Sequence, residues 1–153
     1  MPETGTPRPA EPTQKDIGFF LTPDFSPLGF VSALEVLRTA NRFLGETFYG
    51  WRILSSDGLP VTSANGVTMV ADASPADTSG LDILFVCTGF HPEAHCSERT
   101  LAWLRNMHRH GVHLGAISTG TFVLAKAGVI GERRCTIHGD NTAALREMFD
   151  EID

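Results

Sequence analysis

The run Leu81-Asp-Ile-Leu-Phe-Val-Cys87 is almost continuously apolar. A parallel strand that is covered on both faces has this character, because neither face of it meets water. The segments Ile17–Thr22 and Val112–Ile117 are similar, and Trp51–Ser55 predicts another strand. Helical patterns separate these segments. The sequence therefore predicts an α/β fold with a mostly parallel sheet and helices on both faces.

Capping and turn residues mark the boundaries of the predicted helices. Ser26-Pro27 combines an N-cap residue with proline at the first helical position, and Gly45 ends the helix that follows. Further helices are predicted from Ser97 to near Gly111, over 119–127 and over 141–149. The turn signal Asn65-Gly66 favours a short hairpin or edge segment at Val67–Val70, and Cys135–His138 is a candidate short strand.

Length and charge limit the classes of function. The 153 residues suit one domain, predicted over residues 16–153, after a proline-rich disordered tail at residues 1–15. The net charge is −6, and the longest basic block is Arg133-Arg134, so this chain alone lacks the basic face of a DNA binder. Its three cysteines form no disulfide or zinc pattern. No apolar stretch reaches the ~20 residues that span a bilayer, so a cytoplasmic domain without membrane contact is expected.

Three loops follow predicted strands and should meet at the carboxyl edge of the sheet, where ligands bind in open α/β folds. They are Thr22–Phe25, Thr88–His91 and Ser118–Thr121. The third loop joins a strand to a helix through a sharp Ser-Thr-Gly turn. This is the geometry of a nucleophile elbow, in which backbone N–H groups at a helix N-terminus face an anion.

Several motifs carry a resemblance to a known family. Gly115-Ala-Ile-Ser-Thr-Gly-Thr-Phe-Val-Leu-Ala-Lys-Ala-Gly128 and Arg134-Cys-Thr-Ile-His138 strongly resemble the sensor domain of GlxA-like AraC-family transcriptional regulators. Ile17–Phe30 and Glu35–Asn41 fit the same pattern, and the resemblance covers residues 16–149. It implies a flavodoxin-like three-layer sandwich, similar to the PfpI and class I glutamine-amidotransferase-like superfamily. It also implies that the last strand and helix of the sensor domain are lacking from this chain.

The resemblance implies a sensor of quaternary amines such as glycine betaine or carnitine, or of related amino acids. DNA binding would come through a C-terminal helix-turn-helix domain absent from this chain, and self-association is expected. The chain departs from the family pattern at Gly139, where relatives usually have tryptophan. Superfamily enzymes carry a cysteine at the elbow, whereas this chain has Ser118. A serine needs a positioned base, and His91 and His138 are the only candidates, so the chain is expected not to be an enzyme.

Two alternatives remain open: a PfpI-like hydrolase or amidotransferase-like enzyme that uses Ser118, and a non-functional truncated product. An aromatic cage would hold a quaternary ammonium by cation–π contacts, and Phe25 and Phe90 are its candidate rings. His91 and His95 are four residues apart, with Cys96 adjacent, but no third metal ligand is obvious. Neither a metal nor a cofactor is therefore expected. The predicted ligand-binding residues are Phe25, Gly89, Phe90, His91, Ser118, Thr119 and His138.

Overall fold

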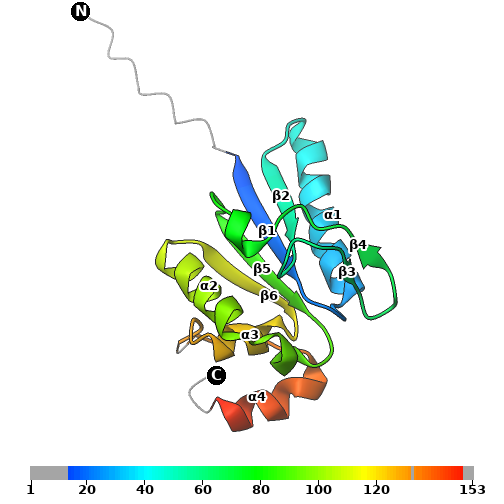
Figure 1. The fold of residues 1–153 in the computed structure, drawn as a ribbon. Coiled ribbons are helices and arrows are strands. Elements are labelled where there is room, and N and C mark those ends of the chain that lie inside the picture. Colours follow the sequence, from blue (N-terminus) through cyan, green and yellow to red (C-terminus); the bar gives the residue numbers. More distant parts are fainter. Residues whose placement is uncertain (1–13, 132, 150–153) are drawn as a thin grey trace, which may run out of the picture.

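A computed structural model of the chain describes residues 14–131 and 133–149. Four strands form the main sheet: β1 (Lys15–Leu21), β2 (Tyr49–Leu54), β5 (Ile83–Thr88) and β6 (His113–Ser118). They are all parallel and lie in the order β2-β1-β5-β6 (Figure 1). The predicted α/β fold with a parallel sheet is therefore confirmed. The first strand begins at Lys15, within the residues predicted as a tail, and residues 1–13 of that tail lie outside the described residues.

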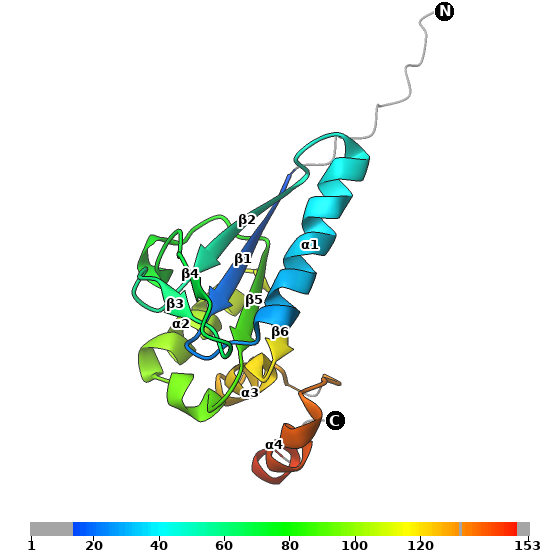
Figure 2. The same cartoon turned by 90° about the vertical axis from the view of Figure 1, so that its right-hand side faces the viewer.

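Helices cover both faces of the sheet, as Figure 2 shows. The helices are α1 (Pro27–Leu44), α2 (Glu98–Arg109), α3 (Gly120–Lys126) and α4 (Thr142–Met148), with 3-10 turns η1 (Pro75–Asp77), η2 (Pro92–His95) and η3 (Gly139–Asn141). The predicted caps are present at two of the helix ends. Gly45 follows α1 with φ of +73°, and the Ser97 hydroxyl accepts from the Thr100 N–H at 3.2 Å before α2.

Two apolar clusters confirm the three-layer arrangement. On one side of the sheet, α1 packs against Phe19 and Phe85, and the Phe30 ring meets Phe19 edge-on at 5.3 Å between centroids. On the other side, α2 and α3 pack against residues of the opposite strand face, among them Phe20 and Val86. Each fully buried large apolar side chain contributes ~1.5–3 kcal/mol, so these clusters dominate the stability of the domain.

The predicted hairpin is also present. Strands β3 (Val61–Thr62) and β4 (Thr68–Met69) pair antiparallel around Gly66, whose φ of +87° suits glycine. The strand predicted at Cys135–His138 is wrong. The carbonyl of Thr136 instead accepts a hydrogen bond from the Thr121 hydroxyl of α3 at 2.6 Å, so a side chain takes the place of a ladder partner. That this chain lacks the last strand and helix of the sensor domain, as the resemblance implies, stays a prediction.

No helix within the described residues is long and apolar enough to cross a membrane.

Candidate ligand site at the strand-to-helix elbow

Ser118 lies where β6 ends and α3 begins. Its φ of +60° places a non-glycine residue in the left-handed region, which costs ~1–2 kcal/mol for an L-residue. Two residues later, a Cβ added at Gly120 would lie 2.0 Å from the carbonyl oxygen of Val86, so only glycine fits this close approach of α3 to β5. The tight strand-to-helix turn predicted from the sequence is therefore present, and it stores strain at Ser118.

Thr119 joins the elbow to the loop after β5. It is buried, and its hydroxyl donates a hydrogen bond to the Gly89 carbonyl at 2.5 Å. Gly89 in turn forms an antiparallel bridge with Phe25, and a Cβ at Gly89 would lie 1.9 Å from the Asp24 carbonyl oxygen. These contacts hold the loops after β1, β5 and β6 together at the carboxyl edge of the sheet.

A cavity of about 330 Å³ opens beside this elbow, and we call it the elbow cavity. It brings together five of the residues that the sequence analysis selected. They are Gly89, Phe90, Ser118, Thr119 and His138. The remaining lining residues, which the sequence analysis missed, are Ser26, Pro27, Ala64, Asp140 and Asn141. Ser26 and Pro27 were noted only as the start of a helix, although their place after β1 at the same sheet edge was a usable signal.

Phe25 and His91 do not line the elbow cavity. The prediction that the Phe25 ring forms a cage wall is wrong in this structure, because that ring is fully buried and packs edge-on against Phe30 at 5.8 Å between centroids. The His91 side chain is 78 % exposed and lies 3.4 Å from a carboxylate oxygen of Glu93. Phe90, by contrast, is 65 % exposed, so its ring is accessible to a ligand.

The ionisable groups of the elbow cavity come from η3 and the residue before it. The His138 ring nitrogen Nδ1 lies 3.8 Å from Asp140 Oδ2, and both side chains are more than half exposed. Asp140 is the carboxylate among the residues that line the cavity. The spacing of two residues between His138 and Asp140 was the available sequence signal for this acidic group.

No base is hydrogen-bonded to the elbow serine among the residues that the structure describes. Within residues 14–131 and 133–149, the Ser118 hydroxyl has no hydrogen-bond partner, and the Thr119 hydroxyl is engaged by Gly89. A serine hydroxyl without a base stays a weak nucleophile at neutral pH. The structure therefore shows the backbone geometry of a nucleophile elbow, but within the described residues no base is hydrogen-bonded to the Ser118 hydroxyl.

Cys87 and Cys96 do not offer a substitute nucleophile. Burial raises the pKa of the Cys87 thiol strongly, and burial also raises the pKa of Cys96. Both thiols are thus held in the protonated, less reactive form. No group of three or more His, Cys, Asp and Glu side chains close enough to hold a metal ion is present among the described residues.

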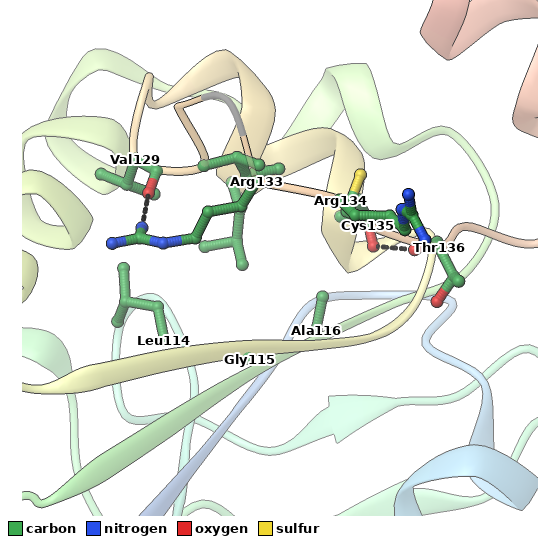
Figure 3. A pocket seen from close by; sticks show the side chains of 11 residues that line it. Leu114, Gly115, Ala116, Val129, Arg133, Arg134, Cys135 and Thr136 are labelled. Carbon is green, nitrogen blue, oxygen red and sulfur yellow. Dashed lines mark hydrogen bonds between the residues drawn. The ribbon is translucent and has the colours of Figure 1, made fainter. Parts of the chain in front are cut away.

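A separate cavity of about 230 Å³ lies over β6, beneath the segment that follows α3 (Figure 3). Leu114 and Ala116 of β6 form one wall, and Arg133 and Arg134 form the other. The Arg133 guanidinium donates to the Val129 carbonyl at 3.4 Å. None of the predicted ligand-binding residues lies in this cavity.

Comparison with known proteins finds transcriptional regulators among the relatives of this chain. It is 42 % identical over 138 residues to the HTH-type transcriptional regulator CdhR of Pseudomonas aeruginosa, which covers 90 % of this chain and 41 % of that protein. It is 34 % identical over 141 residues to the HTH-type transcriptional regulator GlxA of Rhizobium meliloti, and this match covers 90 % of this chain and 43 % of that protein. The chain thus spans about two-fifths of the length of these relatives.

A solved structure and an enzyme also match. The crystal structure of an AraC family transcriptional regulator from Pseudomonas putida superposes with a TM-score of 0.80 at 33 % identity, covering 90 % of this chain and 74 % of that one. The isonitrile hydratase of Pseudomonas putida is 27 % identical over 124 residues, and this match covers 80 % of this chain and 51 % of that enzyme. Residues 15–151 match the DJ-1/PfpI family as a whole. The chain belongs to the DJ-1/PfpI family and resembles the domain of that family found in AraC-type regulators.

Proposed function

We propose that this chain is the ligand-sensing domain of an AraC-type transcriptional regulator and that a small amine or amino-acid-like metabolite binds in the elbow cavity. One observation carries the proposal: Phe90, Ser118 and His138 converge on one cavity of about 330 Å³ at the carboxyl edge of the sheet. Small-molecule sites have volumes of roughly 300–1,000 Å³, so a compact metabolite fits. In such a regulator, a separate domain contacts DNA. We expect the regulator to act in the cytoplasm.

The lining of the elbow cavity suits a quaternary amine such as glycine betaine or carnitine. The exposed Phe90 ring offers a π-face, and cation–π contacts contribute ~0.5–2 kcal/mol. The Asp140 carboxylate supplies the opposite charge from another wall. The Ser118 hydroxyl has no partner within the described residues and is available to donate to the carboxylate of such a ligand.

Helix α1 offers a route for the signal. Ser26 and Pro27, at its N-terminal end, line the elbow cavity. Its outer side exposes Leu28, Val36 and Phe43 by 79 %, 67 % and 87 %. Residues at this spacing fall on one helix face, and an exposed apolar stripe of this kind is typical of an interaction surface. We expect the chain to self-associate through it, so that occupancy of the cavity is transmitted through a helical dimer face.

The alternative is a hydrolase or hydratase that uses Ser118. The strained φ of Ser118 and the similarity to an isonitrile hydratase favour it. Within the described part of the chain no base is hydrogen-bonded to Ser118, which argues against catalysis, because a strained hydroxyl without proton transfer remains unreactive. Sensing therefore accounts for the elbow better than catalysis does.

Thermal unfolding with ligand tests the sensing proposal. A ligand that binds only the folded state raises the melting temperature by mass action. We expect a rise with millimolar glycine betaine, carnitine, choline or arginine, and a smaller rise in Phe90→Ala and Asp140→Asn. Trp51→Phe is the matched aromatic control, since Trp51 lies on β2 outside the cavity. The absence of any shift with these four compounds would count against an amine sensor.

A further inference from the structure

One wall of the elbow cavity belongs to the last described part of the chain. We call residues 137–149, which include η3 and α4, the η3–α4 segment. The wall with Phe90 and Ser118 belongs instead to the loops after β5 and β6, which the hydrogen bond from Thr119 to Gly89 holds together. The residues of the η3–α4 segment that line the cavity are His138, Asp140 and Asn141. The cavity thus lies between two separate parts of the molecule.

Few contacts hold the η3–α4 segment in place. Leu145 is the only buried residue within 137–149, and the Phe149 ring meets the Phe122 ring of α3 edge-on at 5.8 Å between centroids. Among the described residues, no hydrogen bond or ion pair joins this segment to the rest of the molecule, since the contact between His138 and Asp140 lies inside it. In Figures 1 and 2, α4 lies at the edge of the molecule, beyond the sheet.

Helix α4 also has little stability of its own. It has seven residues, and isolated helices shorter than about 12 residues are marginal in water. The Asn141 side chain makes no capping hydrogen bond, and the first turn has no acidic residue to complement the helix dipole. Regions with few buried contacts open at a lower free energy than the core does. The position of the η3–α4 segment is therefore a part of the fold that a ligand can stabilise measurably.

From this arrangement we infer that the η3–α4 segment is a switch, which opens and closes over the elbow cavity and which a bound ligand holds closed. A ligand that touches both Ser118 and Asp140 binds the closed form and not the open form, so it shifts the population toward the closed form. This inference rests on the proposed function, because it takes the elbow cavity as the effector site. It adds a second route for the signal, beside α1.

Hydrogen exchange followed by mass spectrometry tests the switch in the 153-residue chain. Helix α2 is the internal reference, since Ser97 caps it and Leu101 and Leu104 are buried. Without ligand, we expect the amides of α4 to exchange about tenfold or more faster than those of α2. Millimolar glycine betaine or carnitine should slow the exchange of η3 and α4 by about the factor 1 + [L]/Kd and should leave α2 unchanged.

Phe149→Ala separates the switch from direct contact with the ligand, because Phe149 does not line the elbow cavity. Loss of its contact with Phe122 should speed the exchange of α4 in the free chain, while unchanged exchange of α2 reports an intact core. Ligand affinity falls with the fraction of molecules in the closed form, so calorimetry should show binding about fivefold or more weaker. Met148→Ala is the matched control, since Met148 is 52 % exposed, and it should change neither measurement.

The inference is overturned if the amides of α4 exchange as slowly as those of α2 in the free chain, or if an amine that binds leaves the exchange of η3 and α4 unchanged. Equal ligand affinity of Phe149→Ala and the parent also overturns it. These outcomes leave the sensor proposal in place, because calorimetry measures binding separately. If neither amine binds, the sensor proposal and the switch fall together, even where α4 exchanges quickly.

Discussion

Gly89→Ala should destabilise the domain by wedging apart the loops that form the elbow cavity. The added Cβ would lie 1.9 Å from the Asp24 carbonyl oxygen and 3.2 Å from the Phe25 carbonyl carbon. These are backbone atoms, so no side-chain rotation relieves the contact. The two loops must separate by at least about 1 Å to restore van der Waals distance.

The magnitude follows from what this separation breaks. Overpacking costs ~1–3 kcal/mol, and loss of the hydrogen bond from the Thr119 hydroxyl to the Gly89 carbonyl adds ~1 kcal/mol. In a domain of this size, each kcal/mol lowers the melting temperature by ~2–4 °C. We therefore expect Gly89→Ala to melt roughly 5–15 °C lower and to lose ligand affinity in the elbow cavity.

Gly139→Ala is the matched control, because a Cβ there meets no atom within 4 Å and the backbone is not in the left-handed region. Scanning calorimetry of both variants and the parent measures the difference. If Gly89→Ala melts within about 2 °C of the parent while Gly139→Ala does the same, the close packing of the two loops does not limit stability and the reasoning fails.

Three further predictions concern catalysis, pH and DNA. No peptidase, glutaminase or deglycase turnover is expected above background, and a rate that Ser118→Ala abolishes would refute this. The N–H of Asp16 and the ammonium of Lys15 lower the pKa of Asp82. Its stabilising contribution is therefore complete above the unfolded pKa of about 3.9 and is lost as pH falls through the lower folded value. Asp82→Asn should flatten the acid side of a melting-temperature profile between about pH 2 and 5, and parallel profiles would contradict it. With a net charge of −6, this chain alone should show no specific retention of duplex DNA in a gel-shift assay at physiological salt.

The elements that sequence analysis located well are those set by local patterns. The buried strands could be predicted because near-continuous apolar runs such as Leu81–Cys87 are typical of parallel strands that are covered on both faces. Gly45 and Ser97 end and begin helices through contacts within a few residues of themselves. In each case the physical cause lies inside the segment, so a single sequence contains it.

The errors arose where distant residues decide the outcome. Phe25 sits between polar loop residues and was expected at the cavity, but Phe30 and the bridge to Gly89 draw it into the core. Cys135–His138 has the composition of a strand, yet the hydroxyl of Thr121 takes the Thr136 carbonyl. Asp140 was passed over although it lies two residues after His138, a predicted site residue, because its own contacts at the elbow depend on how η3 folds back.

The topology explains why the elbow cavity occurs at the carboxyl edge of the sheet. After β1 the chain crosses to α1 on one face, and after β5 and β6 it crosses to α2 and α3 on the other. Strand order reverses between β1 and β5, so the loops diverge there and leave space on both sides. The elbow cavity uses the side of α1, because Ser26 and Pro27 at the start of that helix line it. The position of the cavity is thus a property of the fold, whereas Asp140 belongs to this sequence, and we propose that its negative charge favours a cationic ligand.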